Sequence, residues 1–297
     1  MSVTVRVPAK VNVQLAVGAA RPDGYHDLAN VFLAVGLHDE VTVTAAEELR
    51  VTCAGPDAGQ VPLDRTNLAA RAALVLAERY GRDADVHIHI AKDIPVAGGM
   101  AGGSADGAGA LLACDALWGT GASRGELLDI CAELGSDVPF SLVGGAALGI
   151  GRGERLTELE VGGSFHWVFA MAARGLSTPA VFREFDRLAE GRDVPVPVAS
   201  RELLDALAKG DVDALAATVS NDLQPAALSL YPELADTLAA GRAAGALASL
   251  VSGSGPTTAF LAPDAGAAEA IAGALRASGT CRTVRTAAGP VPGATVV

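Results

Sequence analysis

The stretch KDIPVAGGMAGGSADGAGALLACDALWG, residues 92–119, decides how this chain is interpreted. The segment DVHIHI at 85–90 precedes it and alternates apolar with polar residues, which is typical of a strand. Pro95 and the glycines between 98 and 103 favour a loop, and the apolar residues that follow predict a helix over 104–117 with Ser104 as its cap. A glycine loop between a strand and a helix can bring several backbone N–H groups onto an anion.

The residues of this loop leave two uses open, a phosphate cradle or a tight structural turn. The loop is not a P-loop, because GxxxxGK[ST] is absent, and it lacks the GxGxxG fingerprint of dinucleotide-binding proteins. The missing fingerprint also argues against a dehydrogenase.

Outward from the loop, the N-terminal part predicts mostly strands. Valines alternate with polar residues from Val3 to Val17, so that Lys10, Asn12 and Gln14 share one face. RPDGYH at 21–26 predicts a turn, and further strands are predicted at 40–44 and 49–53. Helices are predicted at 67–80 and 123–134, the second opened by the capping box SRGE, and a hairpin turning at 151–153 follows.

The second half alternates helices and strands in another order. Strands are predicted at 166–172, 249–252, 257–262 and 281–286, and helices from Thr178 and at 200–209, 211–220, 231–244 and 264–277. With roughly 150 residues per domain as a guide, these patterns predict an α+β fold of two domains, residues 1–160 and 161–297.

Composition narrows the functional classes. The chain has 297 residues, 50% of them apolar, and a net charge of −12 without a basic cluster, so nucleic acid and anionic membranes are poor candidates for partners. No long apolar run predicts a membrane span, and the N-terminus lacks a signal-peptide layout. Four separated cysteines predict buried thiols and a cytoplasmic protein; the oligomeric state stays open.

Three motifs carry a resemblance to a known family. PAKVN at 8–12, PVAGGMAGGSAD at 95–106 and SGSGP at 252–256 resemble, in order and spacing, the motifs of the GHMP small-molecule kinases. The extended block PAKVNVQLAVGAARPDGYHDL at 8–28, with LGSDVPF at 134–140, is similar to the family that phosphorylates 4-diphosphocytidyl-2-C-methyl-D-erythritol in non-mevalonate isoprenoid synthesis. The resemblance covers nearly the whole chain.

The resemblance implies the two-domain GHMP kinase fold, with the active site in the cleft between the domains and ATP and Mg²⁺ as cofactors. The reaction would transfer a phosphoryl group from ATP to the 2-hydroxyl of the methylerythritol. The family's ATP contacts fall on Asn67 and on the loop residues Pro95, Ala97, Gly98, Gly99, Met100, Ala101, Gly102, Gly103 and Ser104. The metal ligands are not identified by it.

The same resemblance implies roles for residues outside the loop. Asp137 matches the catalytic aspartate that accepts the hydroxyl proton, and Lys10 the lysine that pairs with it, an arrangement expected to lower the carboxyl's pKa. The residues that match substrate contacts are Asn12, Tyr25, His26, Asp137, Thr178, Phe182, Gly253 and Ser254. Within this set, Tyr25 and Phe182 are expected to sandwich the cytosine, whose edge would pair with His26.

Each of these residues also has a purely structural interpretation. Asp137 could cap a helix, Asn67 could be a simple N-cap, and Phe182 could be a core residue of its helix. Asp106 is unexplained, because an acid in the first turn of a phosphate-facing helix repels the ligand unless it points away or binds magnesium. Another GHMP kinase, acting on homoserine or mevalonate, and a catalytically silent nucleotide-binding protein remain alternatives.

Overall fold

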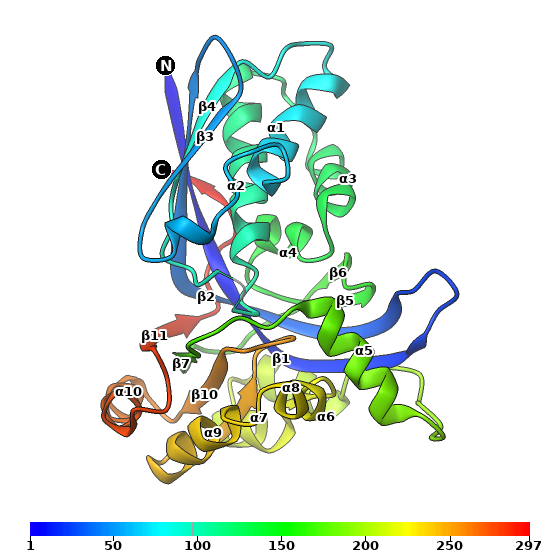
Figure 1. The fold of residues 1–297 in the computed structure, drawn as a ribbon, viewed down its shortest axis with the longest axis vertical. Helices are drawn as coiled ribbons and strands as arrows, with labels where there is room; N and C mark the ends of the chain where they lie inside the picture. Colours follow the sequence, from blue (N-terminus) through cyan, green and yellow to red (C-terminus); the bar gives the residue numbers. More distant parts are fainter. Residues whose placement is uncertain (97) are drawn as a thin grey trace.

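The protein is built on two β-sheets, seen in a computed structural model that describes residues 1–96 and 98–297 (Figure 1). Within those residues the first sheet has eight strands and the second has four. Figure 1 shows the helices of the first sheet in the upper part of the molecule and the second sheet below them, with strands coloured green, orange and red.

A long antiparallel hairpin forms the spine of the first sheet. β1 and β2 are 19 and 20 residues long, and the register shifts between Pro8 and Ala9 and between Asn12 and Gln14. The valines of β1 from Val5 to Val17 are buried, and both faces of the strand are covered between Val7 and Leu15. The strands of this sheet are β1 (Ser2–Ala20), β2 (His26–Ala45), β3 (Arg50–Ala54), β4 (Val86–Ala91), β5 (Ala146–Gly151), β6 (Arg155–Glu158), β8 (Ser220–Asn221) and β12 (Thr295–Val296).

One group of helices packs on the first sheet. α2 contacts both β1 and β2 and packs against α1, so its apolar residues Ala108, Leu111 and Cys114 lie in the core. These helices are α1 (Leu68–Arg79), α2 (Gly102–Trp118), α3 (Arg124–Leu134) and α4 (Val138–Val143), with a short 3-10 turn at Ala58–Gln60.

The second sheet separates two apolar layers. Alternate residues of its strands point to opposite faces, so Trp167 and Phe169 join the core of the first sheet while Val168 and Ala170 pack with α9 and α10. Its strands are β7 (Phe165–Met171), β9 (Ala248–Val251), β10 (Thr258–Ala262) and β11 (Thr283–Gly289). The remaining helices are α5 (Thr178–Ala189), α6 (Arg201–Lys209), α7 (Val212–Thr218), α8 (Gln224–Leu230), α9 (Leu234–Ala243) and α10 (Ala265–Ser278).

The chain passes from the first sheet to the second close to the predicted domain boundary. β6 ends at Glu158 in the first sheet and β7 begins at Phe165 in the second. Two later segments return, however, because β8 and β12 both pair with β1. The division at residue 160 therefore stays a prediction. Residues 220–221 and 295–296 lie after that position in the chain but belong to the first sheet.

Most predicted elements are present, with differences at their ends. The capping box at Ser123 and Glu126 is confirmed by reciprocal hydrogen bonds. The strand over residues 26–39 and the helices α4 and α8 were not predicted. Among the described residues, none of the helices has the length and apolar character that crossing a membrane requires, and all four cysteines are free.

Candidate active site

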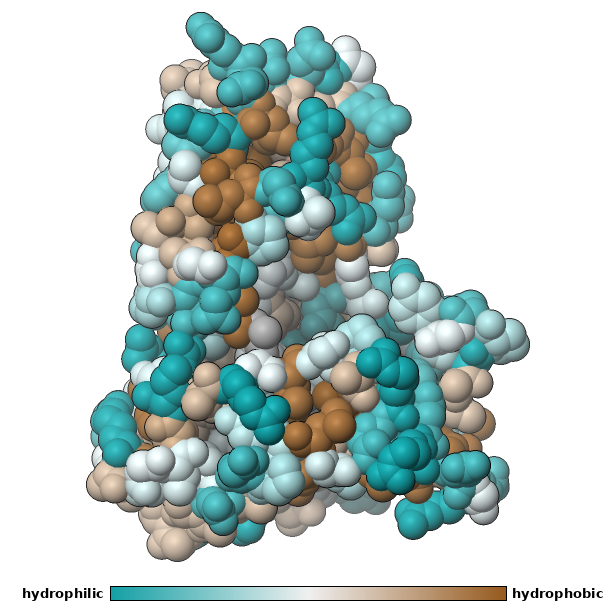
Figure 2. Space-filling view, in the orientation of Figure 1, coloured by the Kyte–Doolittle hydropathy of each residue, from teal (hydrophilic) through white to brown (hydrophobic). Residues whose placement is uncertain are grey.

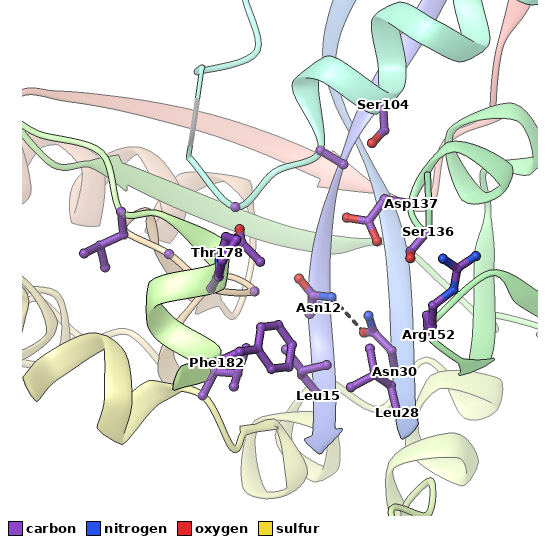
Figure 3. Close-up of a pocket in the computed structure, with 18 of the residues that line it drawn as sticks. Asn12, Leu15, Leu28, Asn30, Ser104, Ser136, Asp137, Arg152, Thr178 and Phe182 are labelled. Atoms are coloured by element: carbon purple, nitrogen blue, oxygen red, sulfur yellow. Dashed lines mark hydrogen bonds between the residues drawn. The ribbon is translucent and has the colours of Figure 1, made fainter. Parts of the chain in front are cut away.

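A cavity of about 790 Å³ brings together residues from distant parts of the chain. Figure 2 shows the molecule hollowed between its upper and lower parts. β1 and β2 form the floor of the cavity, and the glycine loop, the residues around Asp137, the start of α5 and the turn at 253–255 surround it (Figure 3). Of the sequence-predicted site residues that the structure describes, all line it except Asn67 and Met100.

Lys10 is the buried cation of this cavity. It lies on β1 with only 4% of its surface exposed. Its Nζ donates to Asn12 Oδ1 at 2.7 Å and to the Gly99 carbonyl at 2.9 Å, and lies 3.6 Å from Asp137 Oδ2. Burial lowers the pKa of Lys10, and the nearby Asp137 carboxylate opposes that shift. The ammonium is thus held between the glycine loop and Asp137.

Asp137 stands at the N-cap of α4 but makes no capping hydrogen bond with its side chain. Its carboxylate instead faces the cavity on the Lys10 side, across from Asn12 (Figure 3). The helix-cap interpretation does not describe this side chain.

Asn12 is fixed by a second asparagine. Its Nδ2 donates to Asn30 Oδ1 at 2.7 Å, and its Oδ1 accepts from Lys10, so both polar atoms of the amide have partners (Figure 3). Because the Lys10 ammonium can only donate, these two bonds determine which end of the Asn12 amide is oxygen.

The glycine loop leads into α2 with free N–H groups. α2 begins at Gly102, and its N-cap is Ala101 in the left-handed conformation with φ 60°. The prediction that Ser104 caps this helix is wrong: Ser104 is the third helical residue, because the N-cap is Ala101, three residues earlier. The Ala105 N–H already donates to Ala101 O at 2.8 Å. The N–H groups of residues 102–104 have no carbonyl within the helix, so they are available to an anion.

The turn at 252–256, which belongs to the second half of the chain, holds the glycine loop in place. Ser252 Oγ donates to the Gly99 carbonyl at 3.1 Å, and a Cβ on Gly99 would stand 2.1 Å from the Ser252 carbonyl. Gly99 also has φ +73°, so glycine is required there for two reasons. Ser254 Oγ shares a 2.8 Å hydrogen bond with Thr178 Oγ1 at the start of α5.

Asp106 points away from the phosphate side of α2. It is buried and accepts from Lys92 Nζ at 2.7 Å, while the same ammonium donates to Asp39 Oδ2 at 2.5 Å. Burial raises the pKa of Asp106 to about 7, and Lys92 opposes that shift. The acid therefore belongs to a buried ion network beneath the loop.

Aromatic side chains occupy the end of the cavity opposite the loop. The rings of His26 and Phe182 lie 4.9 Å apart, and His26 Nε2 lies 2.8 Å from Asp186 Oδ1. Tyr25 is 52% exposed, and the Arg152 guanidinium lies 5.1 Å from its ring. Phe182 thus faces the His26 ring, and the expected sandwich with Tyr25 stays a prediction.

Two predicted ATP contacts that the structure describes, Asn67 and Met100, do not line the cavity. Asn67 is the N-cap of α1: its Oδ1 accepts from the Ala69 N–H and its Nδ2 donates to the Pro62 carbonyl. The Met100 side chain is fully buried in the core, although the Met100 carbonyl accepts from the Lys10 N–H. Ala97 lies outside the described residues. A nucleotide contact by Asn67 remains a prediction.

Several lining residues were not predicted, notably Asn30, Arg152, Arg183 and Asp186. Asn30 was missed because residues 26–39 were not predicted as a strand, although β2 places it opposite Leu15 of β1. Asp186 lies one turn of α5 after Phe182 and could have been found from that i, i+4 spacing.

The described residues hold no group of three or more His, Cys, Asp or Glu side chains arranged to bind a metal. His87 and His89, which share a strand face, both hydrogen-bond to Thr52 Oγ1. The cavity nevertheless offers hard oxygen donors in Ser104 and Asp137, the type that Mg²⁺ accepts when phosphates and water complete its shell.

Comparison with known proteins agrees with this geometry. Residues 67–145 match the family of GHMP kinases N terminal domain, and residues 203–281 match GHMP kinases C terminal. The 4-diphosphocytidyl-2-C-methyl-D-erythritol kinase of Streptomyces coelicolor is 84% identical over the whole of both chains, and that of Thermobifida fusca is 60% identical, covering all of this chain and 98% of its own.

Solved structures show the same fold. A crystal structure of 4-(cytidine 5'-diphospho)-2C-methyl-D-erythritol kinase is 35% identical, with a TM-score of 0.76, over 96% of this chain and 98% of its own. A homoserine kinase from Cytophaga hutchinsonii has the same TM-score at 21% identity, over 100% of this chain and 97% of its own, which is a likeness of fold alone.

Proposed function

This chain belongs to the 4-diphosphocytidyl-2-C-methyl-D-erythritol kinases of the GHMP superfamily, and we propose that it transfers the γ-phosphoryl group of ATP to the 2-hydroxyl of that substrate. It is an ATP-dependent kinase of the non-mevalonate route to isoprenoid precursors. One observation carries the assignment of its chemistry: the N-terminus of α2, the pair Lys10 and Asp137, and the aromatic end with His26 all line one cavity.

The glycine loop is the proposed ATP phosphate site. The N–H groups at residues 102–104, which make no hydrogen bond to any residue that the structure describes, and the positive end of the α2 dipole favour negative charge there. A Cβ on Gly103 would meet nothing within 4 Å, so the backbone at this position stands open to a ligand. ATP at this end leaves the aromatic end for the acceptor substrate.

Lys10 and Asp137 lie between those two ends and are the proposed catalytic residues. Phosphoryl transfer passes through a loose transition state with charge on the peripheral oxygens, so positioning and cationic donors contribute most of the acceleration. Lys10 Nζ can donate to the transferred group, whose negative charge opposes the lowering of the lysine pKa by burial. Asp137 orients the acceptor hydroxyl and accepts its proton as the new P–O bond forms.

Mg²⁺ fits the residues present. We propose that Ser104 Oγ and the Asp137 carboxylate are the protein oxygens available to the ion, whose chemistry is to neutralise charge on the β- and γ-phosphates. Asn12, oriented by Asn30, is proposed to hold a hydroxyl of the methylerythritol.

The base of the substrate is proposed to lie at the aromatic end. Tyr25, His26 and Phe182 line this end, and a ring nitrogen of His26 can pair with the edge of cytosine while aromatic faces cover its plane. Thr178, Gly253 and Ser254 close the side of the cavity between base and loop and are proposed to contact the substrate there.

The proposal is tested by measuring ADP release with ATP and four separate acceptors: the diphosphocytidyl substrate, the same polyol without cytidine, homoserine and mevalonate. We expect turnover with the first alone. Equal turnover without the cytidine, or a preference for homoserine or mevalonate, would indicate another GHMP kinase. ATP binding without turnover on any acceptor would indicate a silent nucleotide-binding protein.

A further inference from the structure

The contact between His26 and Asp186 joins two segments that are far apart in sequence. His26 begins β2, directly after the turn at 21–25, whereas Asp186 lies in the last turns of α5. His26 Nε2 and Asp186 Oδ1 are 2.8 Å apart, and the histidine side chain is 5% exposed while that of the aspartate is 42% exposed. Both residues line the cavity.

Two phenylalanines of the same helix hold the imidazole ring in place. Phe182 lies 4.9 Å from the ring at an angle of 35°, and Phe185 meets it edge-on at 5.9 Å and 81°. Phe182, Phe185 and Asp186 have the i, i+3, i+4 spacing of one helix face. The ring therefore has a fixed plane, and the carboxylate meets it at one nitrogen.

This contact sets the hydrogen-bonding pattern of the ring. A carboxylate only accepts, so a neutral imidazole facing Asp186 carries its hydrogen on Nε2 and leaves Nδ1 as an acceptor. Nδ1 makes no hydrogen bond to any residue that the structure describes. We propose that Asp186 is a specificity-determining positioning residue, which holds His26 in the Nε2–H tautomer so that Nδ1 accepts from the 4-amino group of cytosine.

The chemical consequence is discrimination between two pyrimidines, and it rests on the proposed function. Cytosine carries a 4-amino donor where uracil carries a 4-carbonyl acceptor. A fixed acceptor on His26 accepts a hydrogen bond from the 4-amino group of cytosine. The same atom cannot bond to the 4-carbonyl of uracil, because both are acceptors. Without the carboxylate, the ring can move its hydrogen to Nδ1 and donate to uracil.

The tautomer is measured directly by ¹⁵N NMR of the imidazole nitrogens, recorded as the pH is raised until the shifts no longer change. The chain has five histidines, so a His26→Gln variant identifies the His26 signals by their loss. We expect Nε2 to carry the hydrogen in the parent and in Asp186→Glu, whose carboxylate still only accepts. Asp186→Ala should give mixed tautomers, and a parent with its hydrogen on Nδ1 would overturn the proposal.

Binding of CDP and UDP, followed by calorimetry, gives the functional test. We expect the parent to prefer CDP by roughly 10- to 100-fold, the size of one unpaired polar contact, and Asp186→Ala to lose about tenfold of that preference. Asp186→Glu, which keeps an acceptor-only group, should retain it. Glu190→Ala, which removes a carboxylate at the end of the same helix, is the matched control and should also retain it.

The outcomes separate this inference from its alternatives. If Asp186 only tied α5 to the hairpin, Asp186→Ala would weaken CDP and UDP equally and leave the tautomer of His26 unchanged, which would contradict the proposal. If the parent binds CDP and UDP equally well, both the pairing of His26 with cytosine and the proposed role of Asp186 are wrong. Phosphoryl transfer to the diphosphocytidyl substrate tests the kinase assignment independently.

Discussion

Asp137 keeps a free carboxylate because of the residues that follow it. An N-cap aspartate normally accepts from the N–H of the second or third helical residue. Here the second residue of α4 is Pro139, which has no N–H, and no capping bond is made. The side chain therefore faces Lys10 and the cavity, where the proposed reaction requires a proton acceptor.

The first prediction concerns Asp137 and Lys10 together. Asp137→Asn should lower kcat by roughly 10²- to 10⁴-fold, the usual contribution of a general base, while ATP binding measured without Mg²⁺ and the melting temperature stay close to the parent values. Lys10→Met should be comparably damaging. Because the two groups act as a unit, the double variant should be little slower than either single variant.

Steady-state kinetics of the four proteins in this cycle provide the measurement. Losses that add fully in the double variant would show that the two residues act independently. An unchanged kcat in Asp137→Asn would remove the carboxylate from the reaction.

The second prediction concerns the aromatic end. Phe182→Ala should raise KM for the diphosphocytidyl substrate by the equivalent of about 1–3 kcal/mol, the scale of a base stacked on an aromatic ring. His26→Ala should cost a similar amount, because the polar edge of the base loses its partner. KM for ATP should not change in either variant. Parallel increases in both KM values would place these residues outside a separate base site.

At the scale of elements, the junction of the glycine loop and α2 combines an open surface with a tightly packed underside. A Cβ on Gly103 meets nothing within 4 Å, whereas one on Gly102 would stand 2.9 Å from Lys92 Nζ and 3.1 Å from Ile94 Cγ2. Neighbouring glycines therefore have different reasons to be glycine. Gly103 opens onto the cavity, where the proposed phosphate site lies, and Gly102 leaves room for Lys92 and Ile94.

The third prediction uses this difference. Gly103→Val should raise KM for ATP roughly tenfold or more with little loss of stability, because its side chain enters only the cavity. Gly102→Val should lower the melting temperature as well. Gly273→Val is the matched control, since Gly273 lies within α10 and a Cβ there also meets nothing within 4 Å. Normal ATP binding by a folded Gly103→Val protein would place the phosphates elsewhere.

The fourth prediction concerns the acid beneath α2. With its pKa raised to about 7, folded Asp106 keeps a proton that the unfolded chain has lost between about pH 4 and pH 7. The contribution of this group to stability therefore falls as pH rises through that window. Asp106→Asn cannot titrate, so its stability relative to the parent should increase from pH 4 to pH 7. Denaturant-induced unfolding of both proteins at several pH values measures the difference between their free energies of unfolding. A difference that stays constant from pH 4 to pH 7 would contradict the prediction.

Sequence patterns predicted elements whose causes are local. The capping box at Ser123, the turn at 21–26 and the helix after the glycine loop depend on residues within a few positions of each other. Residues 26–39 were missed because β2 is buried on both faces there and lacks alternation. The contacts of Asn30 with Asn12, and of Asp186 with His26, depend on tertiary pairing that short-range spacing does not encode.

For the whole molecule, the site depends on segments from both ends of the chain. β1 supplies Lys10 and Asn12, while the turn at 252–256 reaches the glycine loop through Ser252 and Gly99. The C-terminal strand β12 pairs with β1 as well. The cavity is therefore assembled only when both sheets are formed, which explains why its residues are spread over most of the sequence.

The central claim is that this cavity transfers a phosphoryl group from ATP to the cytidylated polyol through Lys10 and Asp137. It is tested most directly by ³¹P NMR of a mixture of the protein, Mg²⁺, ATP and the diphosphocytidyl substrate. The account predicts stoichiometric ADP and a new phosphomonoester signal, with the signal strongly delayed in Asp137→Asn. Inorganic phosphate without the phosphomonoester, or an equal rate in Asp137→Asn, would contradict it.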